Sequence, residues 1–147
     1  MSADEAGLLA VARVRRVRET DSRIGLQSAL AEQRAAQSRV DELRRRLQQA
    51  DRFATGSATE FVALRGSLQV LGMVLLAAVD ELDQTRTISA AALDAWQRDR
   101  ARLAAIEGLL ERRAAVRRTE AARSEARELD DLATQRWQRR RAQDEVA

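Results

Sequence analysis

Proline is absent from all 147 residues of the chain. Because proline removes a backbone donor and clashes with the preceding turn, its absence leaves no position at which a helix must end. The good helix formers Ala, Arg, Leu, Glu and Gln dominate, and aromatic residues make up only 3%. With so few large side chains a compact globular core is not expected, and the composition indicates long helices or a coiled coil.

The first predicted helix covers about residues 4–52. Its second half carries an apolar stripe that consists of Leu26, Leu30, Ala36, Val40, Leu43, Leu47 and Ala50. The spacings are mostly three, four or their sums, so these side chains share one helix face. Val14, Val17 and Ile24 continue the stripe imperfectly toward the N-terminus, with Asp21 interrupting it.

The segment "ATGSATE" (54–60) is the clearest predicted break. Gly56 can take a positive φ after a helix end, and Ser57 with Glu60 has the spacing of a capping box that starts a new helix. A middle helix of about 58–84 should follow. The β-branched cluster "TRTIS" (85–89) predicts a second, weaker break or bend, with Ser89 as the next cap.

The last predicted helix covers about residues 90–142. Its stripe consists of Leu93, Trp96, Leu103, Ile106 and Leu110, and after an Ala-rich section it resumes with Leu129, Leu132 and Trp137. Two long amphipathic helices joined by a shorter one most simply fold back on each other. We therefore expect an all-α, antiparallel two-helix coiled coil, monomeric, with 1–147 as a single elongated domain and both termini at one end.

No catalytic constellation is apparent in the sequence. His, Cys and Lys are absent, so the adjacent acids Glu128, Asp130 and Asp131 read as a solvated turn of helix. We expect no enzyme activity, no cofactor and no metal. The net charge is only +3 because acids interleave with the arginines, which disfavours nucleic-acid binding. A generic coiled-coil interaction protein, nucleic-acid-associated or not, stays open as an alternative.

The stretch "LQVLGMVLLAAV" (68–79) is apolar on two faces. Leu64, Leu68, Leu71, Leu75, Val79 and Leu82 fall on one face, and Val62, Val70, Met73 and Ala77 fall roughly opposite. A doubly apolar helix indicates burial or a partner. The run from residue 66 to 79 is shorter than the roughly 20 residues of a membrane span, so no membrane insertion is expected.

The run "ARSEARELDDLATQRWQRR" (122–140) resembles the end of the FliJ family, small coiled-coil proteins of bacterial flagellar export. "AWQRDRARL" (95–103) is similar to the start of that family's last helix, and "VARVRRVRETDSRIGLQSAL" (11–30) to its basic opening. The YscO-like stalk proteins of injectisomes are the nearest alternative family.

The resemblance implies a non-enzymatic stalk of the flagellar export apparatus. Its partners would be a hexameric FliI-like export ATPase, a FlhA-like export gate protein and export chaperones. Its place would be the cytoplasm, associated peripherally with the cytoplasmic face of the inner membrane.

Two docking sites follow from the arginine clusters and the resemblance together. The ATPase site is predicted to combine both ends of the chain through Arg13, Arg16, Arg136, Arg139 and Arg140, with Leu129, Leu132 and Trp137 holding the helices together there. The gate site that the resemblance implies consists of Val40, Leu43, Leu47, Ala50, Leu71, Val74 and Ala78. For Leu71, periodicity indicates a core position and the resemblance a docking edge, and we expect an edge position in which one side chain serves both.

Overall fold

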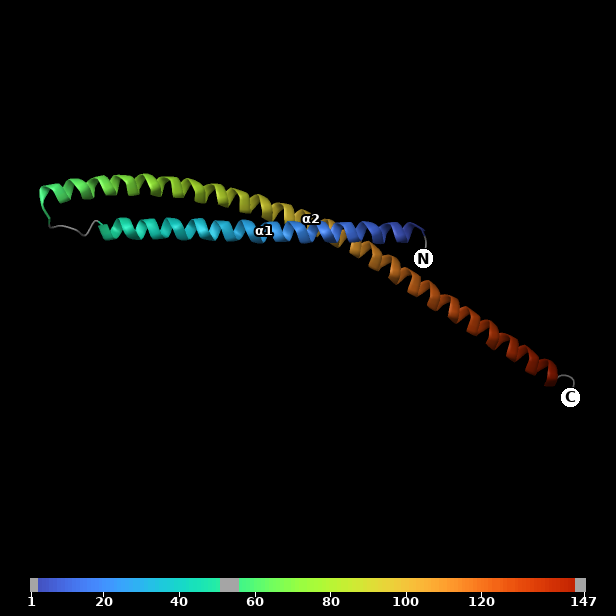
Figure 1. The fold of residues 1–147 in the computed structure, drawn as a ribbon. Coiled ribbons are helices and arrows are strands. Elements are labelled where there is room, and N and C mark those ends of the chain that lie inside the picture. The colour runs from blue at the N-terminus through green and yellow to red at the C-terminus, as the bar shows by residue number, and fades with distance from the viewer. Residues whose placement is uncertain (1–2, 51–55, 145–147) are drawn as a thin grey trace. The chain divides into compact units, whose positions relative to one another are not determined.

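The computed structural model describes residues 3–50 and 56–144, which form two helices. Helix α1 spans Ala3–Ala50 and helix α2 spans Ala58–Asp144 (Figure 1). The two helices pack against each other and no strand is present in the described residues, which confirms the predicted all-α two-helix hairpin. The chain divides into two compact units, one of residues Val14–Leu103 and one of Met1–Arg13 with Ala104–Ala147. Residues 51 and 52, assigned to the first predicted helix, lie outside the described residues.

Helix α2 begins with the predicted capping box. The Ser57 backbone N–H donates to Glu60 Oε2 (2.7 Å), and the Glu60 N–H donates to Ser57 Oγ (3.3 Å). The two residues thus satisfy donors that the first helical turn leaves unpaired. None of the described glycines adopts a positive φ, so the conformation suggested for Gly56 is not observed.

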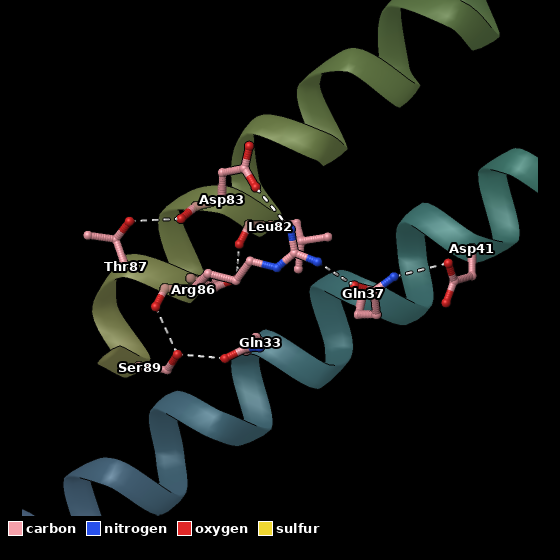
Figure 2. Close-up of polar contacts among 9 residues, drawn as sticks. Gln33, Gln37, Asp41, Leu82, Asp83, Arg86, Thr87 and Ser89 are labelled. Carbon is pink, nitrogen blue, oxygen red and sulfur yellow. Dashed lines mark hydrogen bonds and ion pairs between the residues drawn. The ribbon is translucent and has the colours of Figure 1, made fainter. Parts of the chain in front are cut away.

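The predicted break at residues 85–89 is wrong, because α2 runs through it without interruption. The hydroxyl of Thr85 donates to the Leu82 carbonyl (2.8 Å), and that of Thr87 donates to the Asp83 carbonyl (3.0 Å; Figure 2). These side chains bond to the preceding turn of the helix and so are accommodated within it. The expected middle and last helices are one helix.

In the unit of residues 14–103, the two helices meet along a seam of regular heptad spacing. Along α1 the buried and half-buried positions alternate by three and four, through Leu26, Ala29, Gln33, Ala36, Val40, Leu43, Leu47 and Ala50. Along α2 the same alternation runs through Leu64, Leu68, Leu71, Leu75, Ala78, Leu82, Thr85, Ser89, Ala92, Trp96, Asp99 and Leu103. This is the repeat of a coiled coil, in which such positions face the partner helix.

The tightest packing in that unit lies toward the closed end of the hairpin, where α1 ends and α2 begins. Ala36, Val40 and Leu43 of α1 are buried against Ala78 and Leu82 of α2. Leu71, Leu75 and Val79 pack around this cluster, so most of the α2 face assigned to the core from its periodicity does lie against it. Small alanines on both helices allow the larger Val and Leu side chains to interdigitate.

Farther from the closed end, polar residues occupy the seam. The Trp96 indole donates to the buried Glu19 carboxylate (Nε1–Oε1 2.9 Å), and the Ser89 hydroxyl donates to Gln33 Oε1 across the helices (Figure 2). On the exposed flanks of the buried cluster, Arg86 donates to Gln37 Oε1 (3.1 Å) and Arg39 pairs with Glu81 (3.6 Å). Each buried side-chain nitrogen or oxygen atom that the structure describes has a hydrogen-bond partner, so the polar residues of this part of the seam are accommodated by directed bonds.

The prediction that Val14, Val17 and Ile24 continue the core stripe of α1 is wrong, because these residues lie on a different face of the helix. Val14, Val17 and Ile24 are exposed. Leu30 and Leu93, which were also predicted to lie in the core, are exposed as well. A stiff helix keeps one heptad phase, which the Val40 and Leu43 cluster fixes. That phase directs Glu19 and Ser22, rather than Val17 and Ile24, into the seam.

The second unit holds the start of α1 and the end of α2. Ile106 and Leu110 are half-buried, Arg113 pairs with Asp4 (3.1 Å) and Arg117 pairs with Glu5 (2.7 Å). Beyond this pairing the seam positions of α2 turn wholly polar, as Glu120, Ser124, Arg127, Asp131, Thr134 and Gln138. No apolar seam remains to pair, and the region is exposed.

Leu129, Leu132 and Trp137 do not hold the two helices together, contrary to the prediction. All three are exposed side chains in the described structure. They also lie off the heptad positions that α2 uses for packing, because their spacing of three and five does not follow the seam.

Candidate docking surfaces

The exposed end of α2, residues 118–141, is named the C-terminal arm here. Every side chain that the structure describes in it is exposed. Leu129, Leu132, Arg136 and Arg140 share one helix face by their spacing of three and four. The Arg141 guanidinium lies 5.4 Å from the centre of the Trp137 ring, a cation–π distance. An apolar and basic face of this kind, with no cover from its own unit, is available to a partner.

Within the unit that holds the start of α1 and the end of α2, the structure does not gather Arg13 with the predicted ATPase-docking arginines of the arm. Arg136, Arg139 and Arg140 are exposed on the arm. At about 1.5 Å per residue, Arg136 lies roughly 28 Å along α2 beyond Arg117. Arg13 lies roughly 12 Å from Glu5 along α1 in the opposite direction, because the helices are antiparallel. Arg16 is exposed in the other unit.

Most residues of the predicted gate site are core or seam residues instead of surface residues. Val40 is 0% exposed, and Leu43 and Ala78 are also buried. Leu47, Ala50 and Leu71 are half-buried at seam positions. Val74 alone among the seven is exposed, at 37%. Heptad packing against the other helix therefore uses the side chains that were assigned to a partner, and Leu71 lies against the core as its periodicity indicates.

An exposed apolar face of α2 lies opposite this seam and is named the α2 outer face. It consists of Val62, Val70, Met73, Leu76 and Ala77. The sequence placed most of these residues away from the core, and the 66% exposure of Met73 agrees. An 18-residue window of α2 also has the length and composition of a membrane span, with a mean hydropathy of 1.9 and only 6% of it buried. The expectation that the apolar run of α2 is too short for a membrane span is therefore not supported by its length.

A second exposed apolar face lies on α1 and is named the α1 outer stripe. It consists of Val14, Val17, Ile24, Ala31 and Ala35. Its large members, Val14, Val17 and Ile24, were predicted to continue the core stripe instead. The signal was present in the spacing, since Val17 and Ile24 lie seven residues apart and out of phase with Leu26, Val40 and Leu47.

Among the residues that the structure describes, no group of three or more acidic side chains is arranged to hold a metal ion. The chain matches the model of the flagellar FliJ protein over residues 5–142. No curated protein and no solved structure matches it. Since the match covers nearly the whole chain, this protein belongs to the flagellar FliJ family.

Proposed function

We propose that this flagellar export component is a non-enzymatic stalk that binds the export ATPase ring through its C-terminal arm and links the ring to the export gate. Family membership supports a role in flagellar export, and the family is a non-catalytic component of that apparatus. The observation that carries the finer proposal is the arm itself, an exposed helical extension with no apolar seam. Cytoplasmic location at the membrane-bound apparatus, and contact with export chaperones, belong to the same proposal.

The arm suits insertion into a ring better than pairing with α1. From Arg118 to Arg141 it extends about 35 Å at ~1.5 Å per residue, and a helix with its side chains is about 10–12 Å wide. Its heptad positions are polar, so a second copy of the arm would gain little from coiled-coil packing. Leu129, Leu132 and Trp137, with the nearby arginines, can instead contact apolar and acidic groups of a lumen.

A triple charge reversal tests the ATPase contact. Arg136→Glu, Arg139→Glu and Arg140→Glu together should lower ATPase stimulation by up to about a hundredfold when this protein is limiting. The reason is that three exposed ion pairs, each worth at most ~1 kcal/mol, would be lost. The matched control reverses Arg44, Arg65 and Arg112, which are exposed outside the arm. Circular dichroism should be unchanged in both. Full stimulation by the arm variant, or equal loss in the control, would contradict the proposal.

For the gate contact we propose the α2 outer face in place of the buried set. Met73 and Leu76 are exposed there, on a helix whose opposite face is already packed. Met73→Glu should weaken binding of the gate protein at least about tenfold, because a charge replaces apolar contact area. The melting temperature should hardly change. Ile88→Glu, at another exposed aliphatic residue of α2, is the control. Unaltered gate binding by the Met73 variant would place the contact elsewhere.

A further inference from the structure

The α1 outer stripe has the periodicity of a helix-binding face. Val14, Val17, Ile24, Ala31 and Ala35 follow sums of three and four, as the seam does, but on the opposite side of α1. Val17 is 61% and Ile24 is 57% exposed. From Val14 to Ala35 the stripe runs about 32 Å at ~1.5 Å per residue, which is the length of three heptads of a coiled coil.

Arginines flank this stripe, and several of them are unpaired. Arg18, Arg23 and Arg34 are exposed and form no ion pair with any residue in the described ranges 3–50 and 56–144. Arg45 and Arg46, near the end of α1, differ because both pair with Glu42 (2.8 and 2.9 Å). The basic side chains beside the stripe are therefore available to carboxylates from outside the chain.

We propose that the α1 outer stripe binds an acidic amphipathic helix of another protein, which adds a third helix to the coiled coil. Apolar residues of the partner at heptad spacing would cover Val17 and Ile24, and Asp or Glu beside them would meet Arg18 and Arg23. Ala31 and Ala35 allow close approach of the partner backbone. This contact is separate from those proposed for the ATPase and the gate.

The stripe favours a helix over an anionic membrane surface. It is two heptad positions wide, and Asp21 and Ser28 interrupt it. A membrane-surface helix instead carries a wide apolar face with large residues such as Trp, Phe and Leu. The Asp21 carboxylate would repel an acidic partner helix. The proposal therefore requires that removing this carboxylate strengthens binding.

Fluorescence anisotropy of a labelled synthetic peptide tests the proposal with the full chain. The probe is a four-heptad helical peptide with Leu and Ile at its apolar positions and Glu at the flanks. The control peptide has Lys in place of every flanking Glu. We expect the Glu peptide to bind at least about tenfold tighter than the Lys peptide, and its affinity to fall as salt screens the flanking charges.

Variants of the chain locate the contact. Val17→Ser with Ile24→Ser, and Arg18→Glu with Arg23→Glu, should each weaken binding of the Glu peptide at least about tenfold. Asp21→Ala should strengthen it. The matched controls Ile88→Ser and Arg44→Glu with Arg65→Glu should bind as the unaltered chain does, since they change equally exposed residues outside the stripe. Circular dichroism checks that each variant folds.

Several results would overturn the proposal. They are absence of binding, equal binding of the Lys peptide, or equal loss in the control variants. Binding of phosphatidylglycerol vesicles but not of the peptide would assign the stripe to a membrane surface. Concentration-dependent sedimentation that Ile24→Ser abolishes would assign it to a second copy of this chain. None of these measurements involves the export ATPase, so its docking stands or fails separately.

Discussion

Replacing Val40 with alanine distinguishes a core position from a docking position. Val40 is fully buried between α1 and α2, although the family resemblance implied a role in gate binding. The substitution removes two methyl groups, worth about 0.8 kcal/mol each in transfer free energy. The incompletely filled cavity adds about 1 kcal/mol, which brings the expected loss in the free energy of unfolding to about 2–3 kcal/mol.

Val17→Ala is the matched control, because it makes the same chemical change on the exposed side of the same helix. Its free energy of unfolding should change by no more than about 0.5 kcal/mol. Urea unfolding followed by circular dichroism measures both variants. The melting temperature of the Val40 variant should also fall by roughly 5–10 °C, at about 2–4 °C per kcal/mol for a chain of this size.

Equal stability of the two variants would refute this reasoning. It would mean that the helices do not bury Val40, and that the heptad phase of α1 differs from the one described. Stable Val40→Ala protein with weakened gate binding would return Val40 to the docking surface. Loss of stability without a specific effect on gate binding supports the core position.

Three further predictions concern the cap, the polar seam and acid stability. Ser57→Ala should destabilise the start of α2 by about 1 kcal/mol, because it removes one partner of the capping box. Amide hydrogen exchange in the first turn after Ser57 should become faster. Thr59→Ala, which removes neither partner of the capping box, should leave that exchange unchanged. Trp96→Phe removes the indole donor from the buried Glu19 carboxylate and should cost about 1–3 kcal/mol in urea unfolding; no loss would mean that water replaces that bond. The hydrogen bond from Arg46, with the charge of Arg45, lowers the pKa of Glu42 below its ordinary value of 4.5. The ionised Glu42 therefore stabilises the fold above pH 4.5, and this contribution is lost as the pH falls through the lowered pKa of the folded state. Glu42→Gln should therefore flatten the acid limb of the stability curve, and an unchanged limb would assign the acid sensitivity to other carboxylates.

The sequence determined the helices because their formation is a local matter. Absence of proline, abundant helix formers and the Ser57–Glu60 spacing act within a few residues, and the capping box appears as expected. Local β-branched content at residues 85–89 misled the prediction, since the hydroxyls of Thr85 and Thr87 bond within the helix. The strong periodicity of residues 64–82 also predicted correctly which of their side chains face α1 in most cases.

Only the tertiary structure decided which apolar residues face the other helix. Leu26 and Ile24 are both aliphatic, yet one lies in the seam and the other points outward. The packed cluster at Val40 and Ala78 fixes the rotation of each helix, and a rigid helix transmits that phase to distant polar residues such as Glu19. The same phase leaves the α1 outer stripe uncovered, and α2 continues past Arg117 with a polar seam that offers no packing surface for α1.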